Sequence, residues 1–384
     1  MSSASSGREA FEAEARRLLA EMDGLFGHFF DWLADRYDPV SGGFFYAASS
    51  RRMAGGFGPD IESTAQAVNI LERVGLLAAM PAPMREGLIR FFQERQDPAS
   101  GYFYDGHPNM REDEVMVARA MGYSLGVLRK LGAAPLHPLP AAERAPGYLD
   151  SPEAYVRWLR SVDLSHSWRG CDRLAVSSVY VRQLEPGRRE IFLRTALEEF
   201  TRLQDPVTGL WGGGGWYVRI SGTFKLHTFY SAFDVPMPRV REIYGSILYT
   251  LRTERATDMC FVRNPVHLLS YLRPHLEPDV SPDELLDILR TTKDNLARLL
   301  RGDGGFSREI SGSVEAPNVA QVKAGETYPD LPKPVPLGLG EVEGDMNAGT
   351  QAVLVRTLCY RLAGLGEPAW TPYADGFYER LGWR

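Results

Sequence analysis

Hydrophobic residues recur at helical spacing along almost the whole chain. Between residues 8 and 36 apolar side chains return every three or four positions from Phe11 to Leu33, which predicts a long helix. The same spacing predicts eleven more principal helices and a short C-terminal one, and almost no strand. These eleven cover residues 59–75, 83–95, 111–131, 151–162, 171–183, 187–204, 223–233, 238–251, 257–272, 281–300 and 344–362.

A turn sequence recurs between these predicted helices. It runs Gln204-Asp205-Pro206-Val207-Thr208-Gly209-Leu210-Trp211, with copies at 37–44 and 96–103 and a shorter copy at 302–306. Asp and Pro set the first bend, and Gly supplies the positive φ that ends it. The spacings between the Asp residues are 97−38=59, 205−97=108 and 303−205=98, and the last two are close to twice the first. We infer about six repeated units of roughly 50 residues, each a helical pair.

Six helical hairpins that share one core close naturally into a double ring. We therefore predict an all-α fold, an (α/α)6 toroid of six inner and six outer helices, with residues 1–384 as one domain. The turn sequence resembles the Gln…Gly-x-Trp repeat of squalene/hopene-type terpenoid cyclases. It is also similar to the Gly-Gly-Phe repeat of protein prenyltransferase β subunits. Both families are α/α toroids, so the resemblance implies the fold but not the chemistry.

The catalytic motifs of these families are absent. Cyclases use Asp-x-Asp-Asp or Asp-Asp-x-x-Asp, and neither string occurs. The prenyltransferase zinc site needs Asp-x-Cys and a later His; Cys171-Asp172 and His227 come near, but with different order and spacing. We therefore expect no metal and no cofactor.

Composition and charge exclude several partner classes. The net charge is −6 with no basic block, which disfavours duplex nucleic acid. No apolar run reaches 18 residues, so we expect no membrane span. The first residues are Ser-rich, then acidic and amphipathic, and the three cysteines lie far apart, which predicts a cytoplasmic protein with free thiols.

Candidate chemistry concentrates where the predicted inner helices begin. Inner helices of a double ring run parallel, so their positive N-terminal ends meet at one mouth. Acidic, basic and amide groups stand at or near these starts, and aromatic residues stand mostly in the preceding loops. The set that we assign to substrate binding is Tyr104, Trp168, Arg173, Trp211, Trp216, Tyr217, Lys225, Asp258, Arg263, Asn264 and Asn347.

A mouth rich in carboxylates and aromatic rings suits a sugar, so the first hypothesis is a glycoside hydrolase. Such enzymes place two carboxyl groups across the scissile bond. The preferred acid is Asp172, beside Arg173 and after Trp168, and its partner is Asp60 or Glu62, then Asp345. Each acid has a structural alternative, because a first-turn carboxylate often caps its helix and stabilises it by ~0.5–2 kcal/mol.

Capping does not explain the bases on otherwise apolar inner helices. Elimination from a uronate needs a group that neutralises the carboxylate, and Arg263 with Asn264 would serve. His227 and Tyr230 would supply the base and the acid. A lyase is therefore the second hypothesis. A sugar epimerase would need facing histidines, but His267 lies two to three turns into its predicted helix, so we do not expect it to face His227.

Two other functions stay open. A terpenoid cyclase-like enzyme follows from the resemblance alone, and a toroid could also bind an oligosaccharide without acting on it. The excess of titratable groups at one mouth favours an enzyme over pure binding. Residues 302–343 form a long Gly- and Pro-rich excursion, which we predict to cover the central cavity. The expected partner is a small-molecule or oligosaccharide substrate.

Overall fold

The computed structural model describes residues 3–53, 58–107, 111, 114–140, 146–276, 280–317 and 334–383. Over these ranges the chain is all helical, which confirms the predicted fold class. The β pairing within them consists of isolated bridges, most of them in the turns between helices. No helix among these residues is long and apolar enough to cross a membrane.

The principal helices fall into an inner and an outer set. The inner helices are α3 (Ile61–Arg73), α6 (Glu114–Lys130), α8 (Ser167–Val181), α10 (Trp216–Ala232), α12 (Met259–Leu272) and α14 (Met346–Ala363). The outer helices are α1 (Ser3–Gly24), α2 (Phe29–Asp35), α4 (Ala82–Gln93), α7 (Pro152–Ser161), α9 (Pro186–Leu203), α11 (Val240–Thr253) and α13 (Pro282–Ala297). Two short helices, α15 (Thr371–Ala374) and α16 (Phe377–Arg380), pack against α2 near the C-terminus.

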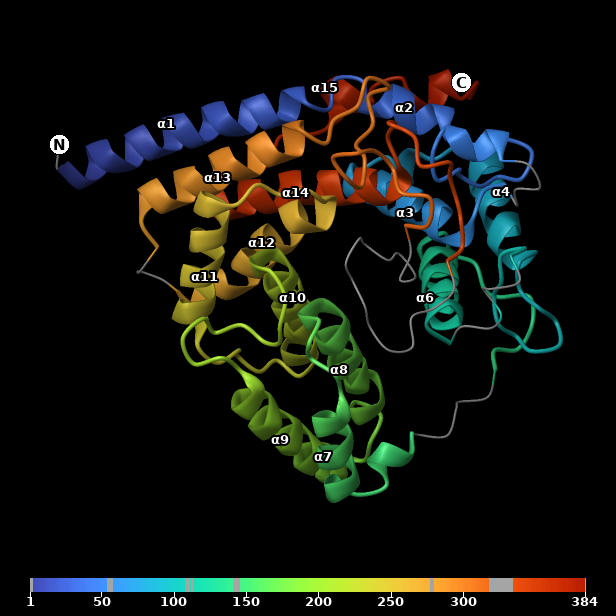
Figure 1. The fold of residues 1–384 in the computed structure, drawn as a ribbon. Coiled ribbons are helices and arrows are strands. Elements are labelled where there is room, and N and C mark those ends of the chain that lie inside the picture. The colour runs from blue at the N-terminus through green and yellow to red at the C-terminus, as the bar shows by residue number, and fades with distance from the viewer. Residues whose placement is uncertain are drawn as a thin grey trace.

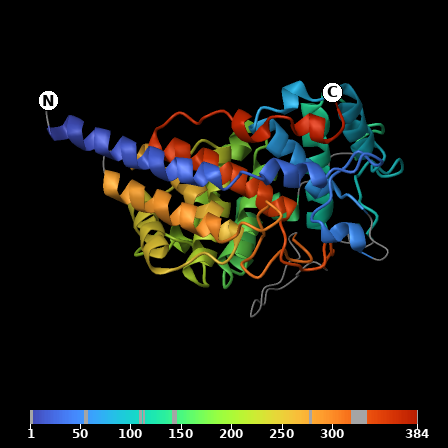
Figure 2. The ribbon, with the colours of Figure 1, turned by 90° about the horizontal axis from the view of Figure 1, so that it is seen from above.

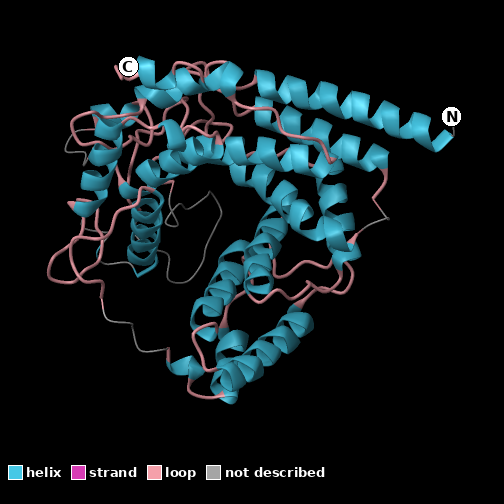
Figure 3. Cartoon of the chain, turned by 180° about the vertical axis from the view of Figure 1, so that it is seen from behind, coloured by secondary structure: helices cyan, strands magenta, loops and turns pink. Residues whose placement is uncertain are grey.

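The inner helices pack side by side in an arc, in the order α6, α3, α14, α12, α10 and α8 (Figures 1 and 3). Outer helices cover this arc: α13 packs on α12 and α14, α11 on α10 and α12, and α9 on α8. The N-terminal helix α1 lies along α13 (Figure 2). This arrangement is compatible with the predicted double ring. Within the residues placed, the two ends of the arc, α6 and α8, do not pack closely on each other.

The repeated turns have the geometry that their sequence predicts. Gly42, Gly101 and Gly209 adopt φ values of 78°, 76° and 68°. The Asp205 carboxylate accepts hydrogen bonds from the amides of Val207 and Thr208 at 2.8 and 3.1 Å. The aromatic residue that follows each turn is buried in the core. The turn acids are therefore structural, as expected.

Three predicted helix boundaries are wrong, and two of them matter for the site. The first helix stops at Gly24 and resumes at Phe29. Helix α8 begins at Ser167 rather than near 171, and α10 begins at Trp216 rather than near 223. The Ser221-Gly222 pair, which directly precedes the predicted start at 223, lies inside α10, where a Cβ on Gly222 would come within 2.6 Å of the Ser167 backbone. Gly222 therefore allows α8 and α10 to pack closely.

Candidate functional site

A cavity of about 310 Å³ lies between the inner helices, and each of the six contributes side chains to it. It is lined by Gln66, Asn69, Arg73, Arg119, Tyr123, Trp168, Lys225, Cys260, Arg263, Asn264, Arg308, Pro317, Asn347, Thr350, Gln351 and Leu354. Arg308 and Pro317 come from the 302–343 excursion. Residues 318–333 lie outside the described residues, so the covering of the cavity by this segment stays a prediction.

Five of these lining side chains are basic, and none of the lining residues placed in the structure is acidic. Three of the bases have a carboxylate partner just outside the lining. Arg119 pairs with Glu62 at 2.6 Å, Lys225 with Asp172 at 2.9 Å, and Arg308 with Asp258 at 3.0 Å. The cavity therefore carries an excess of positive charge, since Arg73 and Arg263 have no such partner among the residues described.

Of these two bases, Arg263 is the better candidate for binding an anion. Arg73 lies exposed at the end of α3, whereas Arg263 is partly buried. The Arg263 Nε donates to Gln351 Oε1 at 3.3 Å, and the guanidinium lies 4.4 Å from the Phe224 ring centroid. Burial lowers the pKa of Arg263, since removal from water disfavours the charged form. A desolvated cation without a counter-charge is unfavourable, and an anion bound in the cavity would relieve that cost.

Asn264 lies one residue further along α12 and also lines the cavity. Its side chain is 1% exposed, and its Nδ2 donates to Ser221 Oγ at 2.9 Å. Its Oδ1 has no hydrogen-bond partner within the described part of the chain. A buried amide atom without a partner is rare in folded proteins and points to a ligand or to an alternative amide orientation.

Tyr123 brings a hydroxyl group to the same cavity from α6. It donates to Glu62 Oε1 at 3.3 Å and accepts from Arg119 Nη2 at 3.3 Å. Burial raises the pKa of Tyr123 to about 12, and the Glu62 carboxylate acts in the same direction. Tyr123 is therefore protonated at neutral pH and can act as a proton donor.

The predicted acids lie outside the cavity lining, and three of them are helix caps. Asp345 accepts from the amides of Ala348 and Arg308 at 2.8 and 2.6 Å and from Ser313 Oγ at 2.9 Å. Asp258 caps α12 through the Cys260 amide, and Asp60 caps α3. Asp172, for its part, lies more than a turn inside α8, because the helix begins earlier than predicted.

The predicted residues His227 and Tyr230 are not among the residues that line the cavity. Tyr230 is buried against Phe200 and Trp211. The His227 and His267 rings lie 5.6 Å apart, so the expectation that they do not meet is wrong. Burial lowers the pKa of His227 to about 4 and that of His267 to about 3. Both imidazoles are therefore neutral at pH 7.

Only one of the predicted aromatic residues lines the cavity. Trp168 does so, with Lys225 Nζ 5.6 Å from its ring centroid. Trp211 and Tyr217 are buried in the core, where the Trp211 Nε1 donates to the Phe200 carbonyl. The remaining predicted residues lie elsewhere: Trp216 against Tyr249, Tyr104 under Arg111, and Arg173 on the exposed face of α8.

Several lining residues are missing from the sequence-based prediction. Most of them lie one to three turns inside the inner helices, beyond the starts on which that prediction concentrates. A signal was present, because Arg119 and Tyr123, and also Asn347 and Gln351, are polar pairs at i and i+4 on otherwise apolar helices. The Asp-x-Cys string of the prenyltransferase zinc site does occur, as Asp258-Met259-Cys260, so the expectation that the catalytic motifs of both families are absent is wrong for this string. Within the described ranges, no group of three His, Cys, Asp or Glu side chains is arranged to hold a metal ion.

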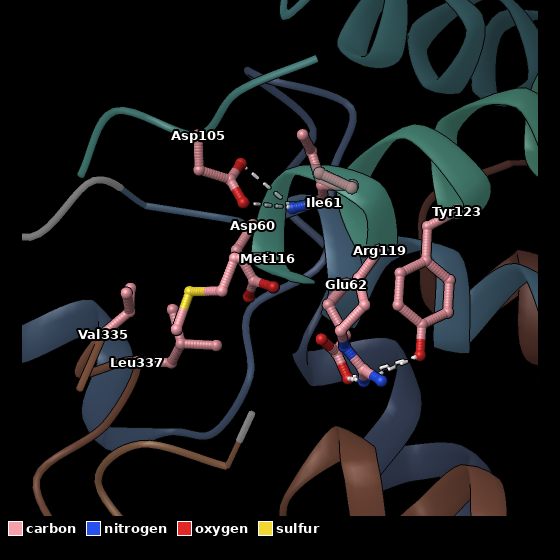
Figure 4. A pocket seen from close by; sticks show the side chains of 10 residues that line it. Asp60, Ile61, Glu62, Asp105, Met116, Arg119, Tyr123, Val335 and Leu337 are labelled. Carbon is pink, nitrogen blue, oxygen red and sulfur yellow. Dashed lines mark hydrogen bonds and ion pairs between the residues drawn. The ribbon is translucent and has the colours of Figure 1, made fainter. Parts of the chain in front are cut away.

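A second, smaller cavity of about 20 Å³ lies beside the first, at the start of α3 (Figure 4). Asp60 and Asp105 are both buried there, 2% and 8% exposed. Asp105 accepts from the Ile61 amide at 3.0 Å and pairs with Arg95. Asp60 Oδ2 has no hydrogen-bond partner among the residues placed in the structure. Burial, followed by the charge of Asp105, raises the pKa of Asp60 to about 8.

This pair predicts a pH-dependent stability. The pKa of Asp60 is raised on folding. The contribution of Asp60 to the free energy of unfolding is therefore fully present below pH ~4 and is lost as the pH rises through about 8. Asp60→Asn keeps an oxygen for the Ser63 amide and removes the charge. We expect the variant to be more stable than wild type at pH 9, by up to roughly 5 kcal/mol for a shift of about four pKa units, and nearly equal at pH 4. Urea unfolding at a series of pH values measures this difference.

A control acid separates burial from capping in that experiment. Asp283 occupies the first turn of α13 but is exposed. Asp283→Asn should leave the pH dependence unchanged. An Asp60→Asn curve parallel to that of the wild type would show that Asp60 is ionised in the folded protein throughout this range.

Comparison with known proteins gives no family for this chain. No protein-family model matches it, and no curated protein does. One solved structure that is similar is described as a crystal structure of a protein from Actinoplanes. That protein is 16% identical, with 92% of this chain and 99% of that chain covered and a TM-score of 0.40. A TM-score of this size does not establish a shared fold.

Proposed function

We propose that this protein is an enzyme acting on an acidic carbohydrate, and that its reaction is β-elimination from a uronate residue. The observation that supports this best is the charge of the central cavity. Five bases line it, none of the described lining residues is acidic, and Arg263 has no carboxylate partner among the described residues. Such a lining favours an anionic substrate over a neutral sugar.

The substrate carboxylate would bind at Arg263. The guanidinium presents parallel N–H donors that match a carboxylate, and partial burial strengthens that interaction. Asn264 is adjacent on the same helix, and its amide could donate to the same carboxylate if Oδ1 turned to Ser221. The Trp168 ring also lines the cavity and offers a face for a neighbouring sugar, with Lys225 beside it.

Neutralising the carboxylate prepares the carbon beside it for proton loss. In the proposed step Tyr123 takes the C5 proton while it passes its own proton to Glu62, with which it is hydrogen-bonded. The C5–H electron pair forms the C4=C5 double bond, and the C4–O4 bond breaks with its electrons on O4. The O4 oxygen then receives the proton back from Glu62 through Tyr123, so that no proton is gained or lost overall.

A glycoside hydrolase is the second candidate, supported by the position of Asp172. This carboxylate is partly exposed and bound to Lys225, beside Trp168 at the cavity. Hydrolysis requires a second carboxyl group facing the first, and the other predicted acids are engaged as caps or ion pairs. A prenyl diphosphate is a weaker candidate substrate, since Trp168, Pro317 and Leu354 are the main apolar side chains of the lining placed in the structure.

A turnover screen tests this function. Wild type and Tyr123→Phe are incubated with uronate-containing and neutral oligosaccharides, and both new C=C absorbance and new reducing ends are followed. We expect absorbance only with the uronates, and a loss of about 100-fold or more in Tyr123→Phe, the range typical for removal of a general acid or base. Tyr249→Phe, an exposed tyrosine on α11, is the matched control.

Other outcomes would overturn the elimination. Reducing ends without absorbance, lost in Asp172→Asn, would assign the protein to the hydrolases. Turnover that Tyr123→Phe leaves unchanged would remove Tyr123 from the mechanism.

A cytoplasmic location also belongs to this proposal, and the three free cysteines are consistent with it.

A further inference from the structure

One of the three cysteines differs from the others in its surroundings. Cys171 and Cys359 are completely buried, and burial raises the pKa of the Cys171 thiol to about 12 and that of Cys359 still further. Cys260 is partly exposed and lines the central cavity. A thiol needs both access and a charge environment that favours the thiolate in order to react. Access singles out Cys260.

Charged groups of both signs lie close to Cys260, whose amide donates to the capping Asp258 carboxylate at 2.6 Å. The residue lies in the first turn of α12, where the helix dipole is positive. The lining bases Arg263 and Arg308 are its electrostatic neighbours. The Cys260 Sγ donates to Gln351 Oε1 at 3.4 Å, and Gln351 in turn accepts from Arg263 Nε. The thiol is therefore connected through Gln351 to the base at which an anion would bind.

A second observation points to a ligand at this position. Asn264, one turn beyond Cys260 on the same face of α12, is 1% exposed and leaves its Oδ1 without a partner among the described residues. Arg263 has no carboxylate partner within those residues. If the amide turns so that Ser221 Oγ donates to Oδ1, the Asn264 Nδ2 group is left to donate to a carboxylate. Three neighbouring side chains of one helix thus bring a thiol, a cation and an amide to the same cavity.

We propose that Cys260 is a site of covalent modification, selective for small electrophiles that carry a carboxylate. The carboxylate binds at Arg263 and holds the electrophilic carbon against the sulfur. This inference rests on the charge of the cavity and does not depend on the elimination proposed above.

Iodoacetate is the simplest probe of this class. The Cys260 thiolate attacks the methylene carbon, a C–S bond forms, and the C–I bond breaks with its electrons on iodide. The thiol proton goes to the buffer, and the product is an S-carboxymethyl group. Iodoacetamide does the same chemistry without a carboxylate, so the ratio of the two rate constants reports the contribution of the charge.

The experiment measures this ratio on the folded full-length protein by peptide mass spectrometry. We expect one adduct, at Cys260, with Cys171 and Cys359 modified only after unfolding. The ratio of iodoacetate to iodoacetamide rates should exceed that of free cysteine about tenfold, the effect of ~1.4 kcal/mol of charge attraction. Arg263→Gln should return the ratio to that of free cysteine, because the iodoacetate rate should fall more than the iodoacetamide rate.

A second measurement covers the case in which Arg263→Gln does not fold. Added salt should lower the wild-type ratio, because the attraction is electrostatic. Equal labelling of the three cysteines, or a ratio that equals that of free cysteine at low salt, would overturn the proposal. A protein that shows the expected ratio but no turnover on any uronate would support this site and refute the elimination, so the two failures are distinguishable.

Discussion

Arg308→Met should destabilise the protein by about 3–5 kcal/mol, the usual cost of removing one partner of a buried ion pair. Arg308 is 8% exposed, and its Nε lies 3.1 and 3.0 Å from the two Asp258 carboxylate oxygens. Its Nη1 donates to Asn347 Oδ1 at 2.9 Å. With methionine in its place, the Asp258 carboxylate, completely buried, would lose its main counter-charge.

Urea unfolding measures this loss, and two further variants locate its cause. Arg252 pairs with Asp287 on the surface, so Arg252→Met should change stability by less than ~1 kcal/mol. Adding Asp258→Asn to Arg308→Met should recover part of the loss, because it removes the buried charge that the single variant leaves unpaired. Similar losses of unfolding free energy for Arg308→Met and Arg252→Met would show that the Arg308–Asp258 pair is well solvated.

The ion pair between Arg308 and Asp258 also shows which parts of this structure the sequence predicts and which it does not. Asp258 and Asp345 were predicted as inner-helix starts because an acid before an apolar periodic run is a cap signal, and both are caps. Their partner Arg308 lies in the 302–343 excursion, with no periodicity to place it. The pairing spans 50 residues and depends on how the excursion folds across the starts of α12 and α14.

The fold was predictable because its signals are local. Helical spacing gave the helices, and the Asp-Pro…Gly turns gave the repeat. Where the prediction failed, tertiary packing decided the outcome: the Ser221-Gly222 pair is a helix interior because α8 passes within contact distance of it. The shifted starts of α8 and α10 moved Asp172 and Lys225 away from their predicted first turns.

The site was only partly predictable, for a related reason. Acidic residues are common at helix starts because they cap the helix. An acid at such a position is therefore as readily a cap as a catalytic residue. The bases Arg263 and Lys225, which capping does not explain, do line the cavity together with Asn264, Asn347 and Trp168. Their neighbours Arg119, Tyr123 and Gln351 come from deeper turns, and their convergence depends on the rotation of each helix about its axis, which the sequence alone does not give.

Arg263→Gln should impair function and leave stability intact or improved, and that opposite response distinguishes a binding residue from a structural one. On an acidic substrate we expect kcat/KM to fall about 100-fold or more, since a charge-assisted contact that stabilises developing charge is worth roughly 2.7–4 kcal/mol. The free energy of unfolding should not fall, because the folded protein no longer holds a partly buried cation without a carboxylate partner.

Two comparison variants make this test specific to geometry and position. Arg263→Lys keeps the charge but not the planar pair of donors, so its kcat/KM should lie between those of wild type and Arg263→Gln. Arg73→Gln removes an exposed base from the same cavity and should change kcat/KM less than fivefold, within the ~1 kcal/mol typical of exposed charges. If Arg263→Gln lost stability and activity in proportion, the guanidinium would be holding the inner helices together through Gln351 and Phe224, and the anion site would have to lie at Arg308 and Lys225 instead.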